Sequence, residues 1–312
     1  MSDKRATREG FYAGLAELGK ERPDIIAVDA DLPKTTGSHA FCTAFPDRYV
    51  NVGIAEQNLV GMSAGLARVG FVPFCSSMAV FAVGRAFEII RNAVAYSRVN
   101  VKIVGSHGGI TAAGDGGSHQ AVEDIAAMRG IPGMVILSPC DYNQAFKMAR
   151  VMCEHDGPMY IRTSREPVEN VTTMDDEVLP GKAQKLIDGG DLLIIATGMM
   201  TVLAVQAAGL LAAENIWPQV MNIHTIKPLD DAAILHEARR CGGRVLVCEE
   251  ANMLGGLGEA VARVLVEEDG IRFSQVAVED RFGQSGLTAE LLEAYGITRE
   301  NIAGKAKALI DR

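Results

Sequence analysis

Two histidines and an aspartate lie close together in one glycine-rich stretch, Ser106 to Asp124 (SHGGITAAGDGGSHQAVED). His107, Asp115 and His119 are separated by eight and four positions. Histidine moves protons near neutral pH, and glycine lets the backbone approach a ligand closely. The stretch therefore predicts proton transfer at a bound substrate. The alternative is a surface loop that merely contains two histidines.

A single glutamate, Glu56, follows an apolar stretch within Tyr49–Gln57 (YVNVGIAEQ) and begins a predicted helix. One interpretation is a helix-start carboxylate that complements the helix dipole. In the other, apolar neighbours such as Ile54 and Leu59 partly desolvate the carboxyl, which then shares a proton with a ligand nitrogen. The residues alone leave both interpretations open.

Short apolar runs alternate with helical stretches along the whole chain. The predicted strands are rich in Val and Ile: Ile25–Val28, Val101–Val104, Met134–Leu137, Leu192–Ala196, Val220–Ile223, Arg244–Cys248 and Ser274–Val278. The predicted helices include Glu9–Lys20, Glu56–Arg68, Val83–Tyr96, Tyr142–Glu154, Met200–Glu214, Asp230–Arg240 and Gly258–Glu268. This alternation indicates an α/β fold with mainly parallel sheets flanked by helices. The histidine stretch follows a strand, so it lies at a carboxyl end of a sheet, where α/β proteins place their sites.

The alternation is interrupted between Arg165 and Asp191 by a charged stretch with Pro167, Pro180 and paired glycines. Such a composition is typical of a domain connection. We therefore predict two α/β domains, over residues 1–166 and 188–312, joined by a linker over residues 167–187.

Composition excludes several classes of protein. The 30 basic and 39 acidic side chains give a net charge of −9. Proteins that bind nucleic acids need an excess of basic residues, so this composition argues against a nucleic-acid partner. The six cysteines form no C-x-x-C pair, which favours reduced thiols in a cytoplasmic protein. The uncharged stretch Leu192–Ala213 is long enough to span a membrane, but Gly198 divides it into a strand and a helix. We expect no membrane association.

Seven motifs in a fixed order cover nearly the whole chain. They are ATR (Ala6–Arg8), ADL (Ala30–Leu32), FPDRYVNVGIAEQN (Phe45–Asn58), the His107–His119 loop, NIHTIKPLD (Asn222–Asp230), EEANMLGGLGEAVA (Glu249–Ala262) and DRFGQSG (Asp280–Gly286). With these motifs the first domain resembles the pyrimidine-binding domain of transketolases, and the second resembles their C-terminal domain.

The resemblance implies an enzyme that uses thiamine diphosphate to transfer a two-carbon ketol unit from a ketose phosphate to an aldose phosphate. In that family the glutamate of the GIAEQ motif, here Glu56, hydrogen-bonds N1′ of the cofactor aminopyrimidine. Phe81 is the candidate for the ring that stacks on the aminopyrimidine, with Phe87 as the alternative. Asp31 and Leu32 match positions at the cofactor, with Leu32 near the thiazolium.

The resemblance also implies a set of substrate contacts. His107 and His119 match histidines that bind substrate oxygens and move their protons, and Asp115 matches a carboxylate that holds a substrate hydroxyl. The positions that bind the sugar phosphate correspond to Arg8, Thr35 and Arg165. Arg162 is an alternative to Arg165, because any guanidinium at this point could bind a phosphate in bidentate fashion.

A complete transketolase also has an N-terminal domain that binds Mg²⁺ and the diphosphate through a GDG motif followed by Asn. Gly114–Gly116 and Asn143 have that spacing here, but the preceding strand ends ten residues earlier, at Val104. Asp115 also has a place in the histidine loop already, so we expect no metal ligand in this chain. The resemblance then implies a separate N-terminal transketolase subunit that holds Mg²⁺ and the diphosphate, in an α₂β₂ heterotetramer.

Other interpretations remain open. The glycine run Gly255–Gly258 precedes a helix but lacks the third glycine of a dinucleotide fingerprint, since position 261 is valine. We therefore expect a strand-to-helix turn here and no NAD.

Two other families are built from similar domains, the β subunit of a 2-oxo acid dehydrogenase and 1-deoxyxylulose-phosphate synthase. The former lacks the His107/Asp115/His119 pattern. The latter has Asp-Arg at the position of Ser106-His107. A non-catalytic relative that only binds a partner is the remaining alternative.

Overall fold

Buried apolar runs form the strands of a first sheet near the N-terminus of the chain. A computed structural model of the protein describes residues 4–311. The strands of this sheet are β1 (Ile25–Asp29), β2 (Tyr49–Asn51), β3 (Val72–Met78), β4 (Lys102–Ser106), β5 (Val135–Leu137), β6 (Met159–Arg162) and β10 (Thr225–Lys227). Their order is β10-β5-β6-β4-β3-β1-β2, and all neighbours pair in parallel except β10, which is antiparallel to β5.

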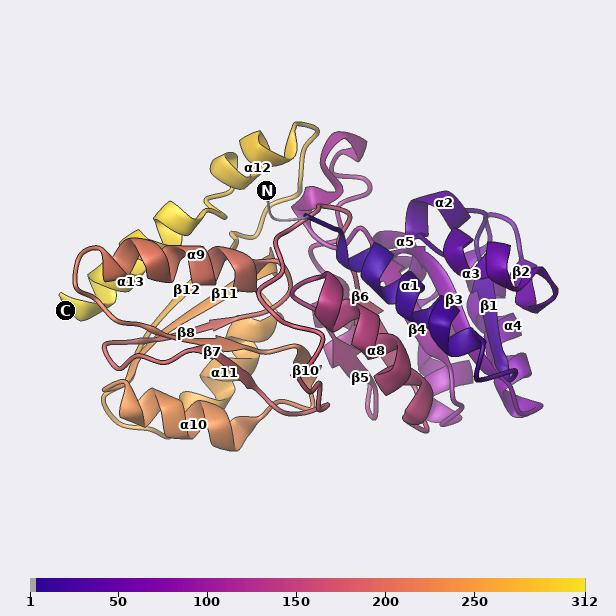
Figure 1. Cartoon of the computed structure of the whole chain (residues 1–312), viewed down its shortest axis with the longest axis horizontal. Coiled ribbons are helices and arrows are strands. Elements are labelled where there is room, and N and C mark those ends of the chain that lie inside the picture. The colour runs from indigo at the N-terminus through magenta and orange to yellow at the C-terminus, as the bar shows by residue number, and fades with distance from the viewer. Residues whose placement is uncertain (1–3, 312) are drawn as a thin grey trace.

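Helices cover both faces of this sheet, which explains why its inner strands are apolar without alternation. The α-helices are α1 (Thr7–Gly19), α2 (Pro33–Thr36), α3 (His39–Ala44), α4 (Glu56–Arg68), α5 (Ala79–Gly84), α6 (Phe87–Ile89), α7 (Asp124–Arg129) and α8 (Tyr142–Glu154). Shorter segments are the 3₁₀-helices η1 (Pro46–Arg48) and η3 (Ile110–Asp115) and the π-helix η2 (Ile90–Tyr96). Helices α1 and α8 lie side by side (Figure 1). Gly14 permits this close packing, because a Cβ at that position would lie 2.1 Å from the Phe146 carbonyl oxygen.

The second domain repeats this layered arrangement. Its strands are β7 (Gln184–Ile187), β8 (Leu193–Ala196), β9 (Gln219–Asn222), β11 (Arg244–Asn252) and β12 (Arg272–Val278). Its helices are α9 (Met200–Ala212), α10 (Asp231–Arg240), α11 (Leu257–Leu265), α12 (Thr288–Ala294) and α13 (Arg299–Ile310). The sheet order is β12-β11-β8-β9-β7, with β7 antiparallel to β9. Helices α9 and α13 cover one face of the sheet, and α10 and α11 cover the other (Figure 1).

The predicted fold class is confirmed, since both domains are α/β with mainly parallel sheets flanked by helices. The predicted helices Glu56–Arg68 and Tyr142–Glu154 coincide with α4 and α8. The prediction of one helix over Val83–Tyr96 is wrong, because α5, α6 and the π-helix η2 divide that stretch. Strand β3 was not predicted, because its sequence, VPFCSSM, mixes proline and serine with its apolar residues.

The connection between the domains holds more structure than its composition indicates. Strand β7 lies within residues 167–187, the predicted linker, and joins the second sheet. Its sequence, QKLI, begins with two polar residues, so it gives no continuous apolar run. Strand β10 follows β9 of the second domain yet pairs with β5 of the first sheet. The two domains are therefore joined by shared β-structure as well as by the connecting chain.

The cysteines and the long uncharged stretch take ordinary places in this fold. All six cysteines are free, and Cys75, Cys140, Cys153, Cys241 and Cys248 are buried. The stretch Leu192–Ala213 forms β8 and α9, as predicted. Among residues 4–311, no helix is both long enough and apolar enough to cross a membrane.

Candidate active site

The carboxyl ends of the parallel strands bring the predicted site residues to one edge of the first sheet. Asp31 follows β1, Phe81 follows β3, His107 follows β4 and Arg165 follows β6. These strands are neighbours in the sheet and run in the same direction. Residues from four separate parts of the sequence are therefore gathered where α/β sheets carry their sites.

His107 is buried and held in one orientation. Its Nδ1 lies 2.9 Å from Ser106 Oγ, and its Nε2 lies 3.2 Å from Arg8 Nη1. Because a guanidinium can only donate, Nε2 accepts, and the ring proton is on Nδ1. Burial and, to a smaller extent, the charges of Arg8 and Arg165 together lower the pKa of His107 to about 4. The ring is therefore neutral at pH 7, with its Nε2 lone pair on the side of Arg8.

Two arginines lie beside this histidine. Arg8 Nη1 also donates to the Thr35 backbone carbonyl at 2.6 Å, which connects α1 to α2, the short helix after β1. Arg165 Nη1 lies 3.1 Å from Asp115 Oδ2, and both side chains are partly exposed. The charges of both arginines act on His107 and on each other, so two cationic groups are gathered here, which suits the recognition of an anionic substrate group.

The alternative arginine, Arg162, has a different environment. Its side chain is buried, lies 3.2 Å from Asp124 and donates to the backbone carbonyls of Ala121 and Glu250 at 2.7 and 2.9 Å. Its charge is paired with Asp124 and its Nη2 is bound to two carbonyls, so it is held inside the protein, whereas Arg165 is 43% exposed. The geometry therefore favours Arg165 for a substrate contact.

Phe81 connects the histidine loop to the end of β3. Its ring centroid lies 5.2 Å from that of His119, and the two rings are nearly perpendicular. His119 Nδ1 lies 2.9 Å from Ser118 Oγ. Phe87 instead lines a cavity of about 330 Å³ with Val80 and Ala127, away from the histidines. Of the two phenylalanines, Phe81 is the one that contacts a predicted site residue.

Glu56 is the first residue of α4, and only 3% of it is exposed. Its Oε1 accepts from Ser77 Oγ at 3.3 Å, and its Oε2 lies 3.7 Å from Arg85 Nε. Both contacts are long for a buried carboxylate, which normally collects several short hydrogen bonds. A cavity of about 280 Å³, lined by Ile54 and Arg85 among others, opens directly at Glu56. The carboxyl can therefore reach a further donor, such as a protonated ring nitrogen.

Sequence reasoning missed one residue that organises this edge, Asp29 at the end of β1. Its buried carboxylate accepts from the Leu32 N–H at 2.5 Å, from Ser38 Oγ at 2.8 Å and from Thr36 Oγ1 at 3.1 Å. Burial raises the pKa of Asp29, and those hydrogen bonds oppose the rise. An acidic residue that ends an apolar strand, IIAVD, is the signal that could have identified it.

The turn held by Asp29 carries the two predicted cofactor positions after β1. Leu32 is half-buried, and Asp31 is exposed with a left-handed φ of 66°. Asp31 Oδ1 accepts from Asn51 Nδ2 at 2.7 Å, so the turn is tied to the end of β2. Asp29 therefore orients the backbone that presents Asp31 and Leu32 at the carboxyl edge.

The structure also places the two glycine motifs for which no ligand is predicted, Gly114–Gly116 with Asn143 and Gly255–Gly258. Asp115 pairs with Arg165, whereas Asn143 Nδ2 donates to the Thr172 carbonyl at 2.7 Å. Within residues 4–311, no group of three or more His, Cys, Asp or Glu side chains could hold a metal ion. The run Gly255–Gly258 lies where the predicted strand-to-helix turn between β11 and α11 ends, and its last two residues are the first two of α11.

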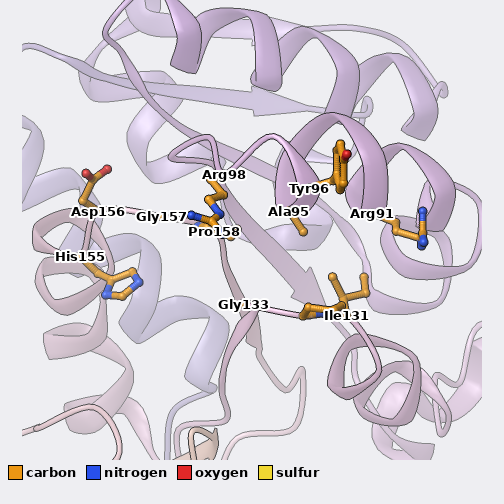
Figure 2. A pocket seen from close by; sticks show the side chains of 11 residues that line it. Arg91, Ala95, Tyr96, Arg98, Ile131, Gly133, His155, Asp156, Gly157 and Pro158 are labelled. Atoms are coloured by element: carbon orange, nitrogen blue, oxygen red, sulfur yellow. The ribbon is translucent and has the colours of Figure 1, made fainter.

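A cavity of about 650 Å³ lies away from these residues. It is formed by the segments that precede β4, β5 and β6, at the amino ends of the strands. Figure 2 shows His155 and Asp156 on one side of it and Tyr96 and Arg91 on the other. None of the predicted site residues lines this cavity.

Comparisons with known proteins agree with this arrangement. A family model described as the transketolase pyrimidine binding domain matches residues 3–170, and the transketolase C-terminal domain matches residues 181–302. A putative transketolase C-terminal section from Methanocaldococcus jannaschii is 42% identical over 303 residues, covering 96% of this chain and 94% of that protein. A 6-deoxy-6-sulfo-D-fructose transketolase subunit from a Clostridium species is 40% identical over 305 residues, covering 98% of this chain and 94% of that protein.

One solved structure, described as a split gene transketolase, inactive beta4 tetramer, is similar along its whole length. It has a TM-score of 0.90 and 42% identity, with 99% of both chains covered. The chain belongs to the transketolase family and matches the C-terminal subunit of a split transketolase. The roles of individual side chains stay predictions.

Proposed function

We propose that this chain provides the substrate-binding half and the Glu56 carboxyl of a thiamine diphosphate-dependent transketolase. One chain of contacts carries the proposal. Glu56 touches Ser77 at the end of β3, and Phe81, four residues further along, touches His119 of the histidine loop. A group held at Glu56 and a sugar held at the histidines would therefore meet at one place.

The residues present fit the pyrimidine end of thiamine diphosphate. Glu56 offers a buried carboxyl with spare hydrogen-bonding capacity beside a cavity, and it would hold a ring nitrogen and its proton there. Phe81 would stack on the ring, and Asp31 and Leu32 would contact the cofactor from the turn after β1. When bound, the cofactor supplies the nucleophilic carbon and electron sink that ketol transfer requires.

The sugar would be bound by the remaining predicted residues. Arg8 and Arg165, with Thr35, would bind the anionic end of a ketose or aldose phosphate. His107, which is neutral at pH 7, and His119 would move protons to and from substrate hydroxyls, and Asp115 would hold a hydroxyl. The sulfosugar named for the Clostridium relative has a sulfonate in place of a phosphate, and an arginine pair can bind either anion.

We further propose a separate N-terminal transketolase subunit that holds Mg²⁺ and the diphosphate, in an α₂β₂ assembly. The absence of a metal-ligating group within residues 4–311 supports a partner that supplies one. An exposed apolar side chain beside Glu56 also supports a partner on this face, since Ile54 lines the same cavity and is 73% exposed. The free cysteines are consistent with a cytoplasmic location.

Reconstitution tests the proposal. Ketol transfer from xylulose 5-phosphate, and separately from 6-deoxy-6-sulfofructose, would be measured with thiamine diphosphate and Mg²⁺. The chain would be assayed alone and mixed with a subunit that carries the GDG and Asn motif. We expect transfer only in the mixture. Stable assembly without transfer of any ketose would favour the non-catalytic alternative, and transfer by the chain alone would contradict the need for a partner.

A further inference from the structure

We propose that Glu250, a residue of the second domain, positions the histidine loop of the first domain for the reaction. The inference rests on the proposed function, because it takes the loop His107–His119 as the sugar-binding element. Glu250 lies on β11 and is 5% exposed. Its Oε1 accepts from the Thr111 backbone N–H at 2.7 Å, and Thr111 lies between His107 and Asp115.

The loop backbone is shaped around this carboxylate. Gly109 has a left-handed φ of 86°, and a Cβ at this position would lie 2.3 Å from the Glu250 carboxyl carbon and from its Oε1. Only glycine accepts both the φ value and the contact. The loop therefore passes as close to Glu250 as a backbone can, two residues after His107.

A second contact from the same domain holds the other end of the loop. Gln120 Nε2, next to His119, donates to the Gln284 carbonyl at 2.9 Å and to the Ile110 and Ala113 carbonyls at 3.0 and 3.2 Å. A Cβ at Gly117 would lie 2.4 Å from the Gly283 carbonyl oxygen. The ends of the loop are joined by the hydrogen bond from the Gly109 N–H to the Ala121 carbonyl at 2.7 Å, and Glu250 and Gln284 fix the segment between them against the second domain.

The surroundings of Glu250 make it sensitive to protonation. Burial raises the pKa of Glu250 to about 7, against the opposing effects of Arg162 and the Thr111 N–H. The charged groups that face it are Arg162 on β6 and Asp124 on α7. The ionised carboxylate is the stronger acceptor for Thr111, because hydrogen bonds to charged groups are stronger than neutral ones. The hold on the loop therefore weakens as the pH falls through about 7.

Glu249 provides a matched control. It precedes Glu250 on β11 and is also buried, but its carboxylate accepts from Leu257 and Gly258 at the start of α11. Amide hydrogen exchange of the full chain would be compared for Glu250→Ala, Glu250→Gln and Glu249→Ala. We expect Glu250→Ala to speed exchange at Thr111 by about tenfold or more. Glu249→Ala should speed exchange at Leu257 and Gly258 and leave Thr111 unchanged.

Kinetics of the reconstituted enzyme complete the test. We expect Glu250→Ala to lower kcat/KM for the ketose by about tenfold to a hundredfold. Glu250→Gln retains an acceptor oxygen, so it should stay within about threefold of the wild type at neutral pH. We also expect kcat/KM of the wild type to decline below about pH 7 and this decline to be absent in Glu250→Gln.

Two results would overturn the inference: unchanged exchange at Thr111 in Glu250→Ala, or a kinetic loss no larger than that of Glu249→Ala. If the wild-type mixture transfers no ketose at all, the proposed function fails instead. The exchange experiment on the chain alone would still decide whether Glu250 holds the loop.

Discussion

Two buried glutamates lie beside a helix N-terminus, one in each domain. Glu56 is the first residue of α4, whereas Glu249 lies on β11 and its carboxylate reaches the start of α11. Glu249 accepts three hydrogen bonds of 2.7–2.9 Å, from the Leu257 and Gly258 N–H groups and from Gln275 Nε2. Glu56 has one hydrogen bond of 3.3 Å and an arginine at 3.7 Å, and a cavity opens beside it.

The difference teaches how to separate a structural carboxylate from a functional one in the same fold. The hydrogen bonds of Glu249 come from its own domain, and they fill the anion-binding end of α11. That is why the glycine run before α11 has no room for a phosphate: a Cβ at Gly256 would lie 2.1 Å from Glu249 Oε2. The capacity left unused at Glu56 points to a ligand that completes the site.

The largest effect is expected from a substitution that removes the carboxyl of Glu56. Glu56→Gln should lower kcat of the reconstituted enzyme by about a hundredfold to ten-thousandfold, because it removes a proton-transferring carboxyl and keeps its volume. Glu17→Gln, at an exposed position of α1, is the control and should retain full activity. Steady-state kinetics and size-exclusion chromatography would be measured together. Unchanged kcat in Glu56→Gln would return Glu56 to the role of a helix-start carboxylate.

A buried histidine in each domain should make the protein less stable in acid. Burial lowers the pKa of both His107 and His224 to about 4. Between pH 6.5, the unfolded value, and about 4, the unfolded state binds more protons, so the free energy of unfolding falls as the pH falls. Each histidine contributes a loss of about 3 kcal/mol at the low end of this window.

The matching variants are His107→Asn and His224→Asn. Asparagine tolerates the left-handed φ of 59° at His107, and it does not titrate. Urea unfolding at pH 7 and at pH 4.5 should show a smaller acid-induced loss of stability in both variants. Only His107→Asn should also lose ketol transfer at pH 7. Equal activity in the two variants would count against a substrate role for His107.

A smaller effect is expected from substitution of Arg165, which tests its assignment as a phosphate contact. Arg165→Ala should raise KM for a phosphorylated ketose by about tenfold and change kcat by less than about threefold, because it removes one exposed charge–anion contact. Arg150→Ala, which breaks an exposed ion pair on α8, is the matched control and should change neither constant. A KM that rises equally for a non-phosphorylated ketose would contradict anion binding by Arg165.

Local sequence predicted the elements that carry the site better than it predicted how they meet. Helix α4 begins at Glu56, as its motif indicates, and His107 follows β4 directly. Strand β7 and strand β10 were missed, because short strands with mixed composition depend on their neighbours for burial. Arg162 and Arg165 were indistinguishable as sequence, since only packing decides which guanidinium is buried against Asp124.

The sequence by itself determined the α/β class, the domain organisation in outline and the transketolase resemblance, because hydrophobic period and motif order are local properties of the chain. Only the tertiary structure decided which buried carboxylates are satisfied and which tautomer His107 has. It alone showed that Glu250, 139 positions from Thr111, reaches the histidine loop. These depend on distances between segments remote in sequence, and such distances are fixed only when both domains fold and pack together.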